Sequence, residues 1–156
     1  MALRCSGVPP RSGRPYRTTV ASFPGLQPGR AGTATLVVTA DDTALALGSG
    51  DVPVLATPRV VLLAEQAAVA ALAAHLPEGS TTVGHRVQLD HLAPTAVGGT
   101  VTAEATLRTI EGRRLTFVVS VRDQRGLVAA GRLTRVVVER ARFLDHAAGS
   151  DPRPAD

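Results

Sequence analysis

The chain has 156 residues, of which 44% are hydrophobic, and it carries a formal net charge of +4. This length fits one domain with short terminal extensions, since domains cluster at roughly 100–150 residues. Every Lys/Arg position is an arginine, and these arginines are scattered through a chain with only 3% aromatic residues. Nucleic-acid binding needs clustered cations and aromatic side chains for stacking, so the composition argues against that function.

The sequence also argues against disulfides, a metal site and a membrane span. Cys5 is the single cysteine, and the four histidines lack the spacing of metal ligands. The most apolar run, residues 59–74, is shorter than the ~20 residues that cross a bilayer, and it contains Glu65. No secretory signal is visible, so we expect a cytoplasmic protein that contacts no membrane.

The first half of the chain predicts a leader, a strand and one long helix. Residues 1–27 are rich in Pro, Gly and Arg and predict a disordered leader. Residues 32–39 predict a strand, and residues 43–47 a short strand or turn. At Thr57-Pro58 a helix should begin, because threonine is a good N-cap and proline suits the first helical position. We expect this helix to run to about residue 75, before Pro77 and Gly79.

The expected helix has apolar residues on nearly all sides, so it must be covered on most of them. Four further strands follow it, and the last three form an antiparallel meander with short turns. Their expected ranges are residues 82–89, 100–109, 115–122 and 127–140. We therefore predict an α+β domain over residues 28–146, with a curved antiparallel sheet around one helix, and a disordered tail over residues 147–156.

Three polar residues stand where the local pattern is otherwise apolar. Thr57 begins the helix, and Glu65 lies eight residues on, which is about two turns and hence the same side. A carboxylate there is costly unless it is paired or hydrogen-bonded. His91 follows directly after the expected strand 82–89. Each has a structural explanation of its own: a cap for Thr57, an ion pair with an arginine for Glu65, and a loop position for His91.

Together with neighbouring motifs, these residues resemble the fluoroacetyl-CoA thioesterase family of hotdog proteins. That family has a Thr, a Glu eight residues later and a His 26 residues after the Glu, followed by Ala-Pro-Thr. This sequence keeps both spacings, with His91 in the segment HLAPT at residues 91–95. It also has the turn IEGRRL at residues 110–115 and an arginine, Arg135, late in the last strand. The resemblance covers residues 29–143.

The resemblance implies a hotdog fold and hydrolysis of an acyl-CoA or acyl-carrier-protein thioester by a homodimer, which could pair further into a tetramer. Thr57, Glu65 and His91 become the expected catalytic residues, and no cofactor is expected beyond the CoA of the substrate. Thr57 is either the nucleophile or the residue that holds the water. Glu65 activates water or forms an anhydride, and His91 polarises the carbonyl or protonates the thiolate. Gly84 and Arg135 become expected substrate-binding residues, Gly84 because a bare backbone allows close approach and Arg135 chiefly as a brace that pairs with an acid.

One departure bears on the substrate. The fluoroacetate-selective member of the family has phenylalanines just before its Thr, whereas residues 47–53 of this chain hold no aromatic. The resemblance therefore implies a different or larger acyl group. The alternative function is a non-catalytic hotdog module that binds an acyl or other apolar ligand without hydrolysing it.

Overall fold

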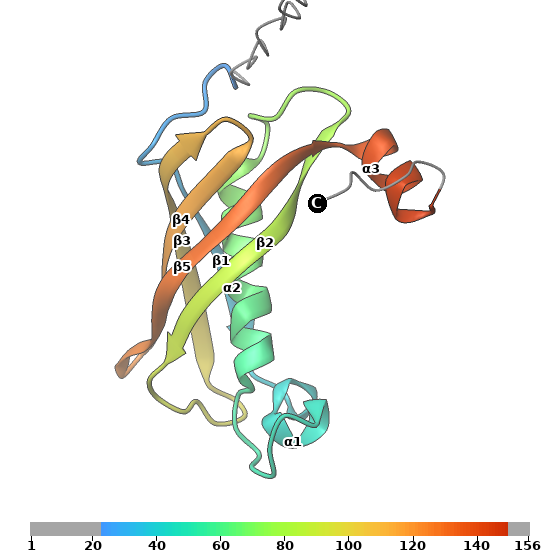
Figure 1. Ribbon diagram of the computed structural model, residues 1–156. Helices are drawn as coiled ribbons and strands as arrows, with labels where there is room; N and C mark the ends of the chain where they lie inside the picture. Colours follow the sequence, from blue (N-terminus) through green and yellow to red (C-terminus); the bar gives the residue numbers. More distant parts are fainter. Residues whose placement is uncertain (1–22, 150–156) are drawn as a thin grey trace, which may run out of the picture.

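The computed structural model describes residues 23–149, so most of the predicted leader and tail, residues 1–22 and 150–156, lie outside the described residues. Within the described part, one long helix is wrapped by a curved five-stranded sheet (Figure 1). The strand order is β1-β3-β4-β5-β2, and all four neighbouring pairs are antiparallel. This confirms the predicted α+β fold with a curved antiparallel sheet around one helix.

The elements follow the predicted order, with two helices that the sequence pattern did not reveal. The strands are β1 (Ala31–Val37), β2 (Ser80–His91), β3 (Thr100–Glu111), β4 (Arg114–Asp123) and β5 (Gly126–Glu139). The helices are α1 (Ala44–Leu47), α2 (Thr57–Leu72) and α3 (Arg140–Ala147), with a 3-10 turn at Ala40–Asp42.

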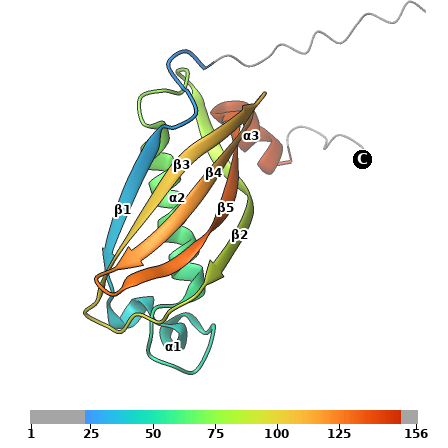
Figure 2. The same ribbon diagram turned by 90° about the vertical axis from the view of Figure 1, so that its left-hand side faces the viewer.

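The core lies between α2 and the concave face of the sheet (Figure 2). Period-two alternation on β3 places four side chains on one face, and all four are fully buried: Val101, Ala103, Ala105 and Leu107. On the helix side, the small residues Ala67 and Ala71 let β1 approach closely. A Cβ on Gly32 would overlap the α2 backbone at these two residues, so only glycine allows this contact.

Two predictions differ from the structure, each for a local reason, and helix α3 was not predicted. Residues 44–47 form helix α1 rather than a strand or turn, because the Thr43 side chain caps the helix by accepting a hydrogen bond from the Ala46 amide. Helix α2 ends at Leu72, before the expected residue 75, and Ala74 takes a left-handed conformation. The last strand ends at Glu139, within one residue of the predicted end, and the Glu139 carboxylate accepts hydrogen bonds from two amides of the unpredicted helix α3.

In the single chain, the long helix is covered on one side, and another side is open. Sheet residues cover one side of α2, but Leu62 and Val69, about two turns apart on the opposite side, are 46% and 50% exposed. Strand β2, at the edge of the sheet, is likewise exposed from Gly84 to Gln88. No helix in the described part of the chain is both long and apolar enough to span a membrane.

Candidate functional site

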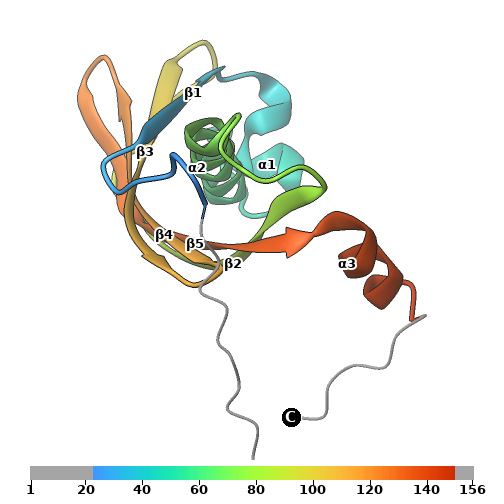
Figure 3. The ribbon, with the colours of Figure 1, turned by 90° about the horizontal axis from the view of Figure 1, so that it is seen from above.

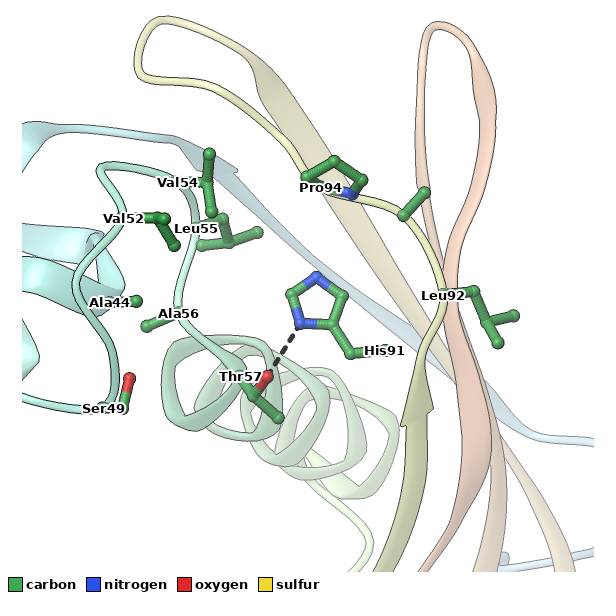
Figure 4. A pocket seen from close by; sticks show the side chains of 11 residues that line it. Ala44, Ser49, Val52, Val54, Leu55, Ala56, Thr57, His91, Leu92 and Pro94 are labelled. Atoms are coloured by element: carbon green, nitrogen blue, oxygen red, sulfur yellow. Dashed lines mark hydrogen bonds between the residues drawn. The ribbon is translucent and has the colours of Figure 1, made fainter.

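A threonine and a histidine meet at the start of α2. The Thr57 Oγ1 atom lies 2.9 Å from the His91 Nδ1 atom, within hydrogen-bond distance (Figure 4). The prediction that Thr57 caps the helix is wrong: Ala56 is the N-cap residue, and Thr57 is already helical. The Thr57 hydroxyl is therefore not committed to a backbone amide and is available to the imidazole.

Backbone contacts on both sides hold this pair together. The segment before α2 is fastened to the segment after β2 by a hydrogen bond from the Leu55 amide to the Thr95 carbonyl, 2.9 Å. A second bond, also 2.9 Å, joins the Ala56 amide to the Asp42 carbonyl. Thr57 follows Ala56 directly, so its position relative to His91 is set by backbone rather than by flexible side chains.

A bulge in β2 turns His91 toward α2. Gly84 lies opposite Arg135 on β5, whereas Arg86 lies opposite Thr134, so the pairing skips His85. Gly84 and His91 are seven residues apart and would point to opposite faces of a regular strand. The extra residue reverses the alternation. As a result, Gly84 and His91 both oppose inward-facing residues of β5, namely Arg135 and Ala129.

The Thr57–His91 pair lines a pocket of about 320 Å³ between the α1 region and the end of β2. Its other lining residues are small or apolar: Ala44, Ser49, Val52, Val54, Leu55, Ala56, Leu92, Ala93 and Pro94. The His91 Nε2 atom is buried and has no hydrogen-bond partner among the described residues. Burial lowers the pKa of His91, against a smaller opposing effect of the Ala93 backbone, so the ring is neutral at neutral pH.

A second polar cluster lies two turns further along α2. The Arg135 Nη1 atom lies 3.3 Å from the Glu65 Oε1 atom. The same guanidinium donates from Nε to Thr82 Oγ1 and from Nη2 to the Thr82 carbonyl, both at 2.9 Å. Arg135 is only 6% exposed. Burial therefore lowers its pKa, and the charge of Glu65 opposes this shift.

Gly84 makes room for the Glu65 carboxylate. A Cβ at position 84 would overlap the Glu65 Oε1 atom. The sequence analysis expected the acyl group of the substrate to approach the Gly84 backbone closely. In the structure, the Glu65 carboxylate occupies the space beside the Gly84 backbone. Thr82 was not singled out from the sequence, because threonine is common in strands and nothing in its neighbourhood marks it.

The five expected site residues thus form two groups along the seam between α2 and β2. Thr57 and His91 are together, and Glu65, Gly84 and Arg135 are together. No hydrogen bond among the described residues joins Glu65 to Thr57 or His91. Thr57 and Glu65 are eight residues apart on α2, which corresponds to a rise of about 12 Å along the helix axis. The two groups therefore lie on the same side of the helix, about two turns apart. Residues 23–149 contain no cluster of three His, Cys, Asp or Glu residues able to hold a metal ion.

Comparison with known proteins gives one consistent result. Residues 38–141 match the family of fluoroacetyl-CoA-specific thioesterases. The fluoroacetyl-CoA thioesterase of Streptantibioticus cattleyicolor is 39% identical over 90 residues, which are 58% of this chain and 65% of that protein. The alignment thus spans slightly less than two thirds of this relative.

Solved structures extend the similarity over more of the chain. A structure of the fluoroacetyl-CoA thioesterase FlK is 32% identical, covers 82% of this chain and 99% of that chain, and superposes with a TM-score of 0.76. A hot-dog-like protein from Thermanaerovibrio acidaminovorans is 28% identical, covers 85% of this chain and 96% of that chain, and gives a TM-score of 0.74. These similarities confirm the predicted hotdog fold.

Proposed function

Because the chain belongs to the fluoroacetyl-CoA-specific thioesterase family, we propose that it hydrolyses an acyl-CoA thioester at Thr57 and His91. The observation that carries this proposal is the 2.9 Å contact between the Thr57 hydroxyl and the partly buried His91 ring, whose pKa is lowered by burial. A hydroxyl within hydrogen-bond distance of a neutral imidazole is the arrangement of an activated oxygen nucleophile and its base. The positive end of the α2 dipole lies at the same place and favours a developing negative charge.

In the first step, the Thr57 Oγ1 atom attacks the thioester carbonyl carbon while the His91 Nδ1 atom takes the hydroxyl proton. The carbon–sulfur bond of the resulting tetrahedral intermediate then breaks. His91 returns the proton to the departing CoA thiolate, leaving an acyl ester on Thr57. When His91 Nδ1 accepts, the Nε2 atom carries the ring proton, and this buried donor lacks a partner among the described residues. A substrate oxygen would satisfy it.

In the second step, water hydrolyses the acyl ester on Thr57, and we assign the activation of this water to Glu65. The water gives a proton to the Glu65 carboxylate and its oxygen attacks the ester carbon. The bond between that carbon and Thr57 Oγ1 then breaks, the carboxylic acid leaves, and the proton held by Glu65 returns through water to Thr57 Oγ1. Arg135 positions Glu65 from behind, because its other two nitrogen atoms are anchored on Thr82. With Arg135 buried and so anchored, its direct contribution to binding the substrate is smaller than its contribution to holding Glu65.

The pocket lacks an aromatic gate, by which we mean phenylalanines next to the pocket such as the fluoroacetate-selective family member has just before its Thr. The α1 side of the pocket contributes Ala44, Ser49 and Val52, and residues 47–53 include no aromatic. A mutant of the thioesterase FlK was crystallised with fluoroacetate and CoA, which supports CoA as the carrier for this family. For this chain we propose a different or larger acyl group than fluoroacetyl, carried on CoA, in the cytoplasm.

We further propose that the active form is a homodimer joined along β2. This strand has 12 residues and pairs only with β5 in the described chain, so its other edge is free. Long unpaired edges are normally blocked or paired in stable proteins. The exposed Leu62 and Val69 lie on the uncovered side of α2, and a second copy joined at β2 would cover apolar surface of this kind.

A hydrolysis screen tests the proposal. Acyl-CoAs of increasing chain length, with fluoroacetyl-CoA among them, are incubated with the protein, and free thiol is measured. We expect turnover that His91→Ala and Glu65→Gln each reduce by about 10²–10⁴-fold. His75→Ala, which changes a histidine beyond the far end of α2, should keep wild-type turnover. Tight acyl-CoA binding with no thiol release at any chain length would instead establish the non-catalytic module.

A further inference from the structure

Helix α3 leaves its apolar side chains largely uncovered by the described part of the chain. None of its eight residues is buried, and its two large apolar side chains, Phe143 and Leu144, are 41% and 59% exposed. A helix this short is marginal in water without tertiary contacts. It is attached to the rest of the chain where the Arg140 amide bonds the Gly79 carbonyl, 2.9 Å. Such a helix indicates a surface that another molecule covers.

Helix α3 lies at the start of β2 and projects past the edge of the sheet. Glu139, directly before α3, pairs with Ser80, the first residue of β2. Figures 1 and 3 show α3 standing away from the sheet, beyond the free edge of β2. This is the side that a second copy occupies if the dimer forms along β2.

The opposite end of β2 carries a complementary surface around the pocket. Two exposed apolar side chains, Val52 and Leu92, line the pocket. Leu45 and Leu47 are exposed on α1, which contributes Ala44 to the same pocket. One exposed acid, Asp51, directly precedes Val52. Helix α3 carries two arginines beside its apolar pair, Arg140 and Arg142. Both surfaces therefore expose apolar side chains, while the charges on α3 are mixed because Asp145 directly follows Leu144.

Two-fold symmetry brings these surfaces together. When two sheets join edge to edge with both helices on the same side, the two β2 strands run antiparallel, so the start of one lies beside the end of the other. We propose that α3 of each subunit packs over the pocket mouth of its partner, with Phe143 and Leu144 as the apolar cover. The aromatic gate that residues 47–53 lack is then supplied in trans. This inference rests on the proposed function and on the proposed homodimer.

Heterodimers with one competent site test the inference. Two chains with different affinity tags are co-expressed, and heterodimers are isolated over both tags. In the first arrangement, one chain carries His91→Ala and the other carries Phe143→Ser with Leu144→Ser. Its single competent site receives an intact α3 from the inactive chain. We expect its KM for acyl-CoA to equal that of the wild type.

In the second arrangement, all three substitutions are on one chain and the partner is wild type. The single competent site then receives the substituted α3, and we expect its KM to rise about tenfold, equivalent to 1.4 kcal/mol of binding. The two heterodimers contain the same substitutions, so any difference between them comes from arrangement alone. Val37→Ser, an exposed apolar residue on the opposite edge strand β1, should leave KM unchanged.

Equal KM values in the two arrangements, or failure to recover any heterodimer, would overturn the inference. If the wild-type protein hydrolyses none of the acyl-CoAs, it is the proposed function that fails. In that case the same heterodimers are compared by acyl-CoA binding. A weaker Kd in the second arrangement alone supports the packing of α3 over the partner's pocket, and equal Kd values overturn it.

Discussion

The Thr57 hydroxyl stands on the first turn of a helix, and its oxygen makes no helix-capping hydrogen bond. It begins α2 but does not cap it, and its contact is His91 rather than a backbone amide. Removing this oxygen should therefore affect chemistry much more than folding, because no helix-capping hydrogen bond is lost with it.

Paired substitutions at Thr57 separate these two effects. Thr57→Val keeps the shape and removes the hydroxyl, so we expect kcat to fall by about 10²–10⁴-fold with little change in Tm. Thr57→Ser keeps the hydroxyl and should retain most of the activity. Steady-state kinetics and thermal melts measure both quantities. A valine variant with wild-type kcat would remove Thr57 from the mechanism.

The protonation of His91 predicts the acid limb of the pH profile. Only the neutral ring can accept the Thr57 proton, so activity falls as the pH drops through the pKa of His91. Burial disfavours the charged ring and lowers this pKa from its ordinary 6.5. We expect kcat/KM to stay constant down to below pH 6.5 and to decline at lower pH. A midpoint at or above pH 6.5 would contradict this, and the limb should be absent from the residual activity of His91→Ala.

Gly84 is the residue at which a single methyl group should displace Glu65. In Gly84→Ala the new Cβ overlaps the Glu65 carboxylate, which must move away from Arg135. Because misplacement of a catalytic group by about 1 Å can cost ~10²-fold, we expect kcat to fall by about that factor. Gly50→Ala is the matched control, since its Cβ would meet Ala44 at an ordinary 3.4 Å. Equal kcat values for the two variants would separate Glu65 from the reaction.

At the scale of the elements, the sequence predicted the scaffold better than the arrangement of the site. The sequence predicts strand β3 and the long helix because burial of one face produces a regular spacing of apolar residues along the whole element. The bulge at His85 has no such signature, yet it decides which way His91 faces. The hydrogen bond between Arg135 and Thr82 could not be predicted from the sequence either, because it joins residues 53 positions apart.

The 3-10 turn before α1 is an element whose role is to hold the start of α2. The Asp42 carboxylate accepts hydrogen bonds from the Thr39 amide and hydroxyl and from Arg59 Nε, all at 2.8 Å. The bond from the Thr39 amide is the main cause that lowers the pKa of Asp42 below 3.8, helped by Arg59. The stabilisation is therefore complete above pH 3.8 and is lost as the pH falls through the lower folded-state pKa.

We accordingly expect Asp42→Asn to lower the free energy of unfolding at pH 7 by about 1–3 kcal/mol, since an amide cannot replace all three charge-assisted bonds. Asp41→Asn, at the exposed neighbouring position, should change it by less than about 0.5 kcal/mol. Denaturant unfolding of the two variants measures the difference. Equal stabilities would mean that these bonds do not hold the start of α2 in solution.

At the scale of the whole molecule, the two edges of the sheet are expected to behave differently. Strands β1 and β2 each have one hydrogen-bonded neighbour in the single chain. If β2 pairs with a second copy, its amides become protected on both sides while β1 keeps a free edge. Amide hydrogen exchange read by mass spectrometry compares the two strands within one sample, so β1 serves as the internal control.

We expect residues of β2 to exchange roughly tenfold or more slowly than those of β1 at micromolar protein, and light scattering to give the mass of a dimer. Dilution to concentrations at which the dimer dissociates should bring the two rates together, because it restores the free edge of β2 without altering β1. A monomeric mass, or β2 exchanging as fast as β1 at all concentrations, would leave the exposed side of α2 uncovered in solution. The thioesterase site would then be formed by a single chain, with Thr57, His91 and Glu65 acting without any residue of a partner subunit.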